Sequence, residues 1–283
     1  MPSLTLLGQS LLSGLFIGGL YGLFGLGLSL SWGLLRLINL AHFALIFLGA
    51  YLTYHLTTTA GLDPFLALLV IAPTFFVLGV ALQAAFARLG VGEFASLLVT
   101  FGLTVVVESV IQGIWTADFR RLESPYGTAT LRAGPLFLPV TEVLILAAAT
   151  ALSLATWAWL RYTYVGKALR AGAEDPAIAA AFGVDHRRLA LLLSGMGAAY
   201  AGVAGTFVAL LYTLAPSQIY AWIGVVFAVV ILGGLGKPLG PLVAGIAIGM
   251  SEAITMALTA PSWAPLVSFT LLILVLVLRP DRV

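Results

Sequence analysis

The 283-residue chain contains no cysteine, only three histidines and very little charge, with 8% Asp, Glu, Lys and Arg. The absence of cysteine excludes disulfides, thiolate metal sites and cysteine nucleophiles. The histidines, at positions 42, 55 and 186, are too scattered for a metal-binding motif, and no Gly-x-Ser-x-Gly nucleophile motif is present. The sequence therefore argues against an enzyme, and we expect this chain to bind no cofactor or metal.

Hydrophobic residues take the place of the missing charges and make up 61% of the chain. A soluble domain has about a quarter of its residues charged. Apolar runs of about 20 residues recur throughout, and each is long enough to cross a hydrocarbon core as a helix. Residues 143–160 and 266–278 lack the alternation of a β-barrel. The predicted fold is all-α: a polytopic transmembrane helix bundle of about 8–9 segments, some interrupted, in one domain spanning residues 1–283.

The orientation of this bundle depends on how its interrupted segment is counted. The expected spans are 8–32, 41–59, 65–87, 94–116, 139–160, 188–212, 222–258 with a break near 233–240, and 264–279. If the broken span makes two passes, one face of the membrane receives Arg36, Arg88, Arg161, Lys167, Arg170, Arg187, Arg188, Lys237, Arg279 and Arg282, and the other only Arg120, Arg121 and Arg132. The positive-inside rule then predicts an external N-terminus and a cytoplasmic C-terminus. A single pass would remove this imbalance.

The first interruption lies in residues 33–55, GLLRLINLAHFALIFLGAYLTYH. One helix from residue 20 to 55 would be far longer than a bilayer is thick, so the chain must turn near Arg36, Asn39 and His42. One interpretation is a capped turn, with Asn39 as N-cap and His42 hydrogen-bonded to the backbone. The other is an unwound segment that lines an aqueous path, because non-helical backbone at membrane depth must be buried in protein or face water.

The second interruption is ILGGLGKPLGPLVAGIAIG at residues 231–249. Gly233, Gly234, Gly236 and Pro238 disfavour a continuous helix. Interrupted segments in both halves of a chain indicate a transporter with discontinuous helices along its path. The segment is not a phosphate-binding loop, because Ile231 replaces the first glycine and Pro238 replaces the Ser or Thr that binds magnesium.

Two acidic residues, Glu108 and Glu252, lie inside apolar runs, where carboxyl groups usually face a bundle interior or a cavity. Each is interpreted either as a helix–helix hydrogen bond or as part of a path. Glu252 is the stronger path candidate because it follows the glycine-rich break by about three turns. The predicted path residues are Asn39, His42, Gly233, Gly234, Gly236, Pro238 and Glu252.

The polar segment 161–187 predicts one short helix outside the membrane, with Asp175 as N-cap and Gly183 beyond its end. It is either a surface turn or a docking helix, since Ile178 and Phe182 lie four residues apart and acidic residues can meet a basic partner. The candidate docking residues are Glu174, Asp175, Pro176, Ile178, Ala179, Phe182 and Gly183. Separately, the four-residue spacing of Gly14, Gly18 and Gly22 predicts a helix-packing surface.

Three segments together carry a family resemblance: LSWGLLRLINLAHFALIFLGAYLTYH, VGKALRAGAEDPAIAAAFGVDHRRLALLLSGMGAAYAGVAGTF and AVVILGGLGKPLGPLVAGIAIGMSEAI. They resemble the permease subunits of branched-chain amino-acid ATP-binding-cassette importers, the shorter of the two paired types. One departure is that Phe43 and Ala44 replace the Gly-Glu pair that commonly follows the NLAH turn in that family.

The resemblance implies a permease of a bacterial or archaeal plasma (inner) membrane that forms the path for a small polar solute. Branched-chain amino acids are favoured, with other amino acids, urea and amides as alternatives. The implied partners are two ATPase subunits, which dock at residues 174–183 in the cytoplasmic loop 161–187, a second permease or copy of this chain, and a solute-binding protein at the external loop 117–138. Membrane lipid surrounds the chain, and nucleic acid is not expected. The alternative is a self-sufficient ion-coupled secondary transporter or channel that uses Glu108 and Glu252.

Overall fold

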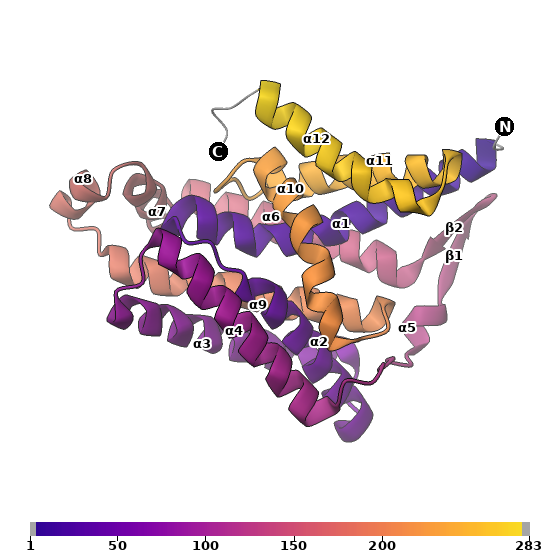
Figure 1. Ribbon diagram of the computed structural model, residues 1–283, viewed down its shortest axis with the longest axis horizontal. Coiled ribbons are helices and arrows are strands. Elements are labelled where there is room, and N and C mark those ends of the chain that lie inside the picture. Colours follow the sequence, from indigo (N-terminus) through magenta and orange to yellow (C-terminus); the bar gives the residue numbers. More distant parts are fainter. Residues whose placement is uncertain (1–3, 279–283) are drawn as a thin grey trace.

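The computed structural model describes residues 4–278 and confirms an all-α polytopic bundle (Figure 1). The long helices are α1 (Leu4–Leu35), α2 (Ala41–Ala60), α3 (Pro64–Leu89), α4 (Glu93–Trp115), α6 (Val140–Tyr162), α9 (His186–Leu211), α10 (Ile223–Gly233), α11 (Gly240–Leu258) and α12 (Ala264–Leu278). The shorter elements are α5 (Pro125–Thr128), α7 (Tyr164–Glu174), α8 (Pro176–Ala181), two 3-10 helices (Pro216–Trp222 and Pro261–Trp263), and strands β1 (Thr130–Ala133) and β2 (Leu136–Pro139). Eight helical segments are long and apolar enough to cross a membrane, and Pro261–Val277 forms a shorter apolar helix.

The bundle has two distinct ends, which Figure 1 shows at opposite sides of the molecule. At the hairpin end, the Gln9 side-chain amide donates to the carbonyl oxygen of Phe137 in β2 at 3.0 Å. At the α8 end, the Arg36 guanidinium donates to the carbonyl oxygen of Ala173 in α7 at 3.4 Å. The α8 end carries Arg36, Arg88, Arg161, Lys167, Arg170, Arg187, Arg188 and Lys237, and the hairpin end carries Arg120, Arg121 and Arg132, whereas Arg279 and Arg282 lie outside the described residues.

The break at residues 234–239 is a turn that joins α10 to α11. A Cβ on Gly233 would overlap the carbonyl group of Gly240, and Ala228 and Val229 of α10 pack in one cluster with residues of α11. Gly234 and Gly236 adopt φ values of +87° and +73°, which L-residues with side chains rarely adopt. Pro216–Gly233 and Gly240–Leu258 are each long and apolar enough to cross a membrane, as the two-pass alternative requires.

Helices α1 and α11 pack closely through glycines, as the spacing of Gly14, Gly18 and Gly22 predicted. A Cβ on Gly18 would lie 2.5 Å from the Cα atom of Ile246, and one on Gly245 would lie 2.5 Å from the carbonyl oxygen of Gly18. Small residues at such an interface let two backbones approach and gain dispersion contacts in a solvent where apolar burial gives little driving force. This contact holds α11 along most of α1.

Two elements were not predicted. The segment 161–187, where the sequence predicted one helix, contains α7 as well as α8. Thr163 caps α7 by accepting from the Gly166 N–H at 3.0 Å, and the buried Leu169 packs in a cluster with residues of α1. The loop 117–138 contains α5 and an antiparallel pair of strands in which Thr130 faces Pro139. All of these elements are too short to span a membrane, so the search for long apolar runs that identified the spans carried no signal for them.

A Gly18→Ala variant tests the close packing of α1 on α11. We expect it to unfold at a lower temperature in detergent, because overpacking a close contact costs about 1–3 kcal/mol. Gly113→Ala is the matched control, since nothing lies within 4 Å of a Cβ there and alanine favours a helix over glycine. Thermal unfolding followed by tryptophan fluorescence measures both. Equal stability of the two variants would contradict the packing described here.

Candidate functional site

The second interruption predicted from the sequence, the α10–α11 turn, packs against the end of α1 that leads into the first interruption. The Gly236 N–H donates to the carbonyl oxygen of Ser29 at 3.0 Å, and the Ser29 hydroxyl lies 3.5 Å from the carbonyl oxygen of Gly234. A Cβ on Gly33 would overlap the backbone nitrogen of Gly236, so glycine is required there for the turn to approach α1. The end of α1 and the α10–α11 turn thus form one structural unit.

The first interruption is an unwound segment of five residues, 36–40, whose backbone is satisfied from α4. Thr100 accepts from the Leu40 N–H at 3.0 Å, and its hydroxyl lies 3.2 Å from the carbonyl oxygen of Ile38. The Ser96 hydroxyl also donates to the Ile38 carbonyl oxygen, at 3.4 Å. Buried backbone groups need such partners, because leaving one unpaired in an apolar medium is costly. Ser96 and Thr100 therefore permit the helix to stop inside the bundle.

Asn39 does not cap α2, and that prediction was wrong. The N-cap residue is Leu40, and no side chain bonds to the cap. Only the main-chain oxygen of Asn39 takes part in the turn, accepting from the His42 N–H at 3.3 Å. The side-chain Oδ1 of Asn39 is buried and has no hydrogen-bond partner among the described residues. Asn39 instead lines a very small cavity, of about 10 Å³, whose walls are formed by the polar Ser31, Gln83, Ser96, Thr100 and Ser194 and the apolar Leu35, Leu37, Ile38 and Phe86.

His42 is hydrogen-bonded to the backbone, as the first interpretation of the turn predicted. Its Nε2–H donates to the carbonyl oxygen of Phe24 in α1 at 3.0 Å, and the side chain is buried. The adjacent Phe43 and Ala44, which replace the family's Gly-Glu pair, are also buried, and the Phe43 ring stacks on Phe227 with centroids 6.2 Å apart. The position that would hold the acid is thus a fully buried alanine, and the residue before it, Phe43, makes an apolar contact between α2 and α10.

Glu252 joins three helices and lies apart from the interruptions. Tyr21 of α1 donates to Glu252 Oε2 at 2.8 Å, and Ser268 of α12 donates to Oε1. This is the helix–helix hydrogen bond that one interpretation predicted. Glu108, the other acid in an apolar run, accepts from the Tyr220 hydroxyl at 2.6 Å. The structure therefore brings Asn39, Gly233, Gly234, Gly236 and Pro238 to the α8 end, and leaves Glu252 in the other half of α11.

The short helix α8 has the predicted caps and projects from the bundle (Figure 1). Asp175 Oδ1 accepts from the N–H groups of Ala177 and Ile178 at 2.9 and 3.0 Å, Pro176 begins the helix, and Gly183 follows it with φ of +83°. Ile178 is 58% exposed and Phe182 is 83% exposed. These two side chains present an apolar surface beyond the long helices.

Two of the candidate docking residues are placed differently from the prediction. Ala179 is only 5% exposed, so it faces the rest of the protein and is not part of the outer surface of α8. Glu174 is the last residue of α7, because the chain changes direction at Asp175. The outer surface of this element therefore consists of Ile178 and Phe182, with the acidic Glu174 and Asp175 beside them.

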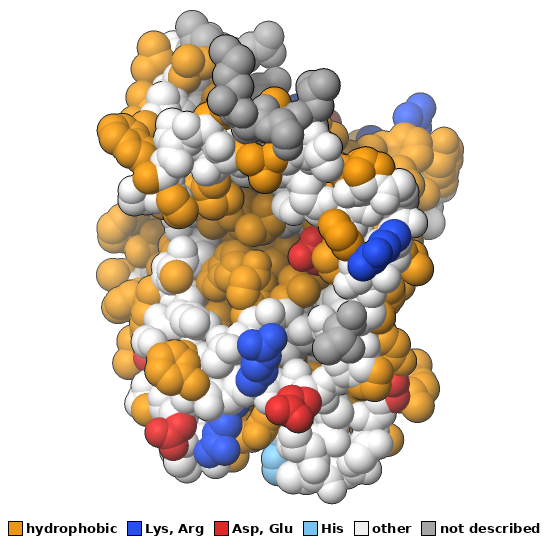
Figure 2. All heavy atoms as spheres, turned by 90° about the vertical axis from the view of Figure 1, so that its right-hand side faces the viewer, with side chains coloured by type: hydrophobic (Ala, Val, Ile, Leu, Met, Phe, Trp, Pro, Cys, Tyr) orange, Lys and Arg blue, Asp and Glu red, His pale blue; other side chains and the backbone are white. Residues whose placement is uncertain are grey.

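The hairpin end has a hollow centre in which hydrophobic side chains gather, with basic and acidic side chains around it (Figure 2). Arg120, predicted to be a surface charge of loop 117–138, donates to the Trp115 carbonyl oxygen at 3.2 Å and to the Thr116 hydroxyl at 3.3 Å, so it supports the local fold. Tyr126 of α5 donates to Asp63 at 2.8 Å, and this hydrogen bond raises the pKa of the Tyr126 phenol.

Ser96 and Thr100 are the functional residues that the sequence analysis missed. They belong to a series on α4, with Thr104 as the third member, in which hydroxyl residues recur every four positions. That spacing places them on one helix face, so the signal was present. Gln83 and Ser194 were also missed, and their side chains bond to each other at 2.9 Å beside the same cavity. No three His, Cys, Asp or Glu side chains within residues 4–278 group to hold a metal ion.

An apolar multi-pass bundle with paired helix interruptions and a capped helix beyond the membrane is the architecture of a transport permease. The chain belongs to the family described as "Branched-chain amino acid transport system / permease component", which matches residues 10–276. It is 28% identical to the high-affinity branched-chain amino acid transport system permease protein LivH of Escherichia coli, over 97% of this chain and 94% of the relative.

Other relatives carry similar names. The permease protein BraD of Pseudomonas aeruginosa is 24% identical over 100% of this chain and 97% of its own length. A probable branched-chain amino acid transport permease protein of Methanocaldococcus jannaschii is 26% identical over 82% of this chain and 76% of its own length. No solved structure matches the chain. The family is thus one of components of transport systems, in agreement with the resemblance seen in the sequence.

Replacing Thr100 by valine tests whether α4 supports the unwound segment. We expect Thr100→Val to destabilise the protein by about 1–3 kcal/mol, because the buried Leu40 N–H loses its partner. Thr104→Val is the control, since Thr104 is equally buried on the same helix and its hydroxyl donates only to the Thr100 carbonyl oxygen of its own helix. Thermal unfolding in detergent compares them. If Thr104→Val loses as much stability as Thr100→Val, Thr100 has no special role in supporting the unwound segment.

Proposed function

We propose that this chain is a transmembrane permease subunit of an ATP-binding-cassette importer, and that it forms the path for branched-chain amino acids. The observation that carries the proposal is α8, a capped and exposed helix at one end of a bundle that belongs to a permease family. A self-sufficient transporter has no need of an apolar helix presented beyond its spans. The solute class rests on the names of the relatives, which are branched-chain amino acid permeases.

The proposed energy source is a pair of ATPase subunits that dock at α8. Ile178 and Phe182 would enter an apolar groove of the partner, as an amphipathic helix does, and Glu174 and Asp175 would meet basic residues at its rim. A second permease, either a homologue or a copy of this chain, would complete the path. A solute-binding protein would deliver the amino acid at the hairpin end.

The distribution of basic residues supports an orientation with the α8 end in the cytoplasm. Eight Lys and Arg residues lie at that end and three at the hairpin end, and positive charge is retained on the cytoplasmic side. The N-terminus would then be external and the C-terminus cytoplasmic, in the plasma (inner) membrane of a bacterium or archaeon. The same orientation places the external loop 117–138, with its exposed Arg121, where a binding protein arrives.

The proposed path runs past the unit formed by residues 36–40 and the α10–α11 turn. Asn39 offers its unpartnered side-chain Oδ1 in the small cavity, and Gly233, Gly234, Gly236 and Pro238 lie at the α10–α11 turn, which packs on the end of α1. His42 and Glu252 hold neighbouring helices together and would act on transport through the positions of those helices. A path that binds solute weakly leaves high affinity to the external protein.

Purification with partners tests the function directly. We expect the chain, tagged at its C-terminus and solubilised gently from native membranes, to retain ATPase subunits and a permease that mass spectrometry identifies in near-equal amounts. Liposomes containing this complex should take up leucine, isoleucine and valine only when ATP and the binding protein are both present. If the chain is recovered alone and a proton or sodium gradient drives its uptake, the importer hypothesis is wrong and the chain is an ion-coupled transporter.

Phe182→Asp tests the docking role of α8. We expect it to remain folded, because the side chain is 83% exposed, and to lose most of the co-purifying ATPase and of the ATP-driven uptake. Phe119→Asp is the matched control, since Phe119 is 75% exposed at the hairpin end. The readout is the ratio of ATPase to permease after purification. An unchanged ratio in Phe182→Asp, or an equal loss in Phe119→Asp, would contradict docking at α8.

A further inference from the structure

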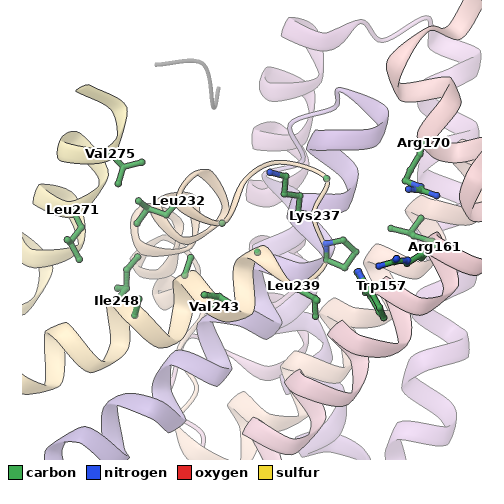
Figure 3. Close-up of a pocket in the computed structure, with 17 residues that line it drawn as sticks. Trp157, Arg161, Arg170, Leu232, Lys237, Leu239, Val243, Ile248, Leu271 and Val275 are labelled. Atoms are coloured by element: carbon green, nitrogen blue, oxygen red, sulfur yellow. The ribbon is translucent and has the colours of Figure 1, made fainter. Parts of the chain in front are cut away.

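A groove of about 1150 Å³ opens at the α8 end between α6, α7, the α10–α11 turn and α12, and we call it the α12 groove (Figure 3). One wall carries Trp157 and Arg161 of α6 and Arg170 of α7. The opposite wall is apolar and includes Leu271 and Val275 of α12. The lining of the groove includes Gly233, Gly236 and Pro238, so one side of the α10–α11 turn faces the groove, but the groove shares no residue with the small cavity beside Asn39 or with the exposed surface of α8.

The lining of the α12 groove carries positive charge and no negative charge. Arg161, Arg170 and Lys237 are its charged residues. Within residues 4–278 the ion pair is that of Arg188 with Asp185, so these three cations have no carboxylate partner there. Helix α11 begins at Gly240 in the same lining, and a helix N-terminus adds partial positive charge. The charge pattern therefore fits an anionic group.

The groove lies where the membrane meets water. Arg161 lies 5.2 Å from the centre of the Trp157 ring and 5.7 Å from that of Tyr162, an arrangement of aromatic and basic side chains that is typical of membrane interfaces. Helix α7 buries Leu169 and exposes Lys167 and Arg170, as a helix at an interface does. Below the cations the walls become apolar, and Val243 of α11 is 66% exposed there.

We propose that the α12 groove binds an anionic phospholipid. The phosphate group lies among Arg161, Arg170 and Lys237, and an acyl chain lies along the apolar residues of α11 and α12. A soluble anion would use the cations but leave the apolar walls exposed, whereas a zwitterionic lipid would use the walls without matching the charge. Only an anionic lipid meets both features. The lipid would hold the α10–α11 turn against α6 and α7.

Trp157 provides a fluorescence reporter of the bound lipid. The purified complex is placed in phosphatidylcholine nanodiscs that contain brominated phosphatidylglycerol or, in parallel, brominated phosphatidylcholine at the same mole fraction. We expect phosphatidylglycerol to quench more strongly, and Trp157→Phe to remove the difference between the two lipids. Mass spectrometry of the lipids retained by the unmodified complex, which should be enriched in phosphatidylglycerol, is an independent readout that needs no variant.

Matched double variants test the cations. Arg161→Gln with Arg170→Gln should weaken phosphatidylglycerol binding about 25-fold, because each basic residue near the surface contributes about fivefold to the binding of anionic lipid. Arg161→Lys with Arg170→Lys should retain most of the affinity. Arg121→Gln with Arg132→Gln removes the same charge at the hairpin end and should have no effect. An equal loss in this last variant would overturn the proposal.

Three further outcomes would also overturn it. Equal quenching by the two brominated lipids would show that charge has no part in binding. Displacement of the lipid by millimolar inorganic phosphate would assign the cations to a soluble anion. The chain has no cysteine, so Val243→Cys introduces a single thiol into the groove. Efficient cross-linking of Val243→Cys to a neighbouring chain would assign the groove to a second permease, whereas alkylation without cross-linking leaves it open to lipid.

Discussion

The hydrogen-bonding requirement of the backbone in an apolar medium determines how this chain can interrupt its helices. A helix that stops inside a bundle exposes N–H and C=O groups that lipid cannot satisfy. At residues 36–40 the hydroxyls of Ser96 and Thr100 supply partners, and at the α10–α11 turn the Gly236 N–H bonds to Ser29 in α1. Each interruption is thus supported by another helix.

Close packing of glycines completes the same unit. Because Gly33 has no side chain, the α10–α11 turn can pack against the end of α1. Because Gly18 has none, α11 can pack along the middle of α1. Because packing replaces apolar burial as the main attraction between helices in lipid, removing a side chain can strengthen an interface there. Glycines such as Gly18, Gly33 and Gly245 are therefore required for the packing of α1, α10 and α11, and do not indicate flexibility there.

The sequence predicted the features that depend on the spacing of residues and on the length of apolar runs. It missed those that depend on contacts between residues far apart in the sequence. Hydropathy located the spans, capping residues located α8 from Asp175 to Gly183, and four-residue spacing located the glycine surface of α1. Asn39 was expected to cap α2, but its side-chain Oδ1 has no partner among residues 4–278, because the His42 N–H bonds to the main-chain oxygen of Asn39 instead. Ala179 was expected on the outer surface, yet α7 and the turn at Asp175 fix which side of α8 faces the protein. Neither outcome follows from local sequence.

The end of α1 connects the proposed docking helix to the interruptions. Arg36 bonds to Ala173 in α7, and α7 leads directly into α8, while Gly33, three residues earlier, contacts the α10–α11 turn. Under the proposed function, a displacement of α8 by an ATPase would reach this turn through one short stretch of backbone. Arg36 has φ of +55°, which is uncommon for a residue with a side chain and is maintained only where its surroundings fix it. The bond to α7 is one such constraint, so the conformation of this stretch depends on the position of α7.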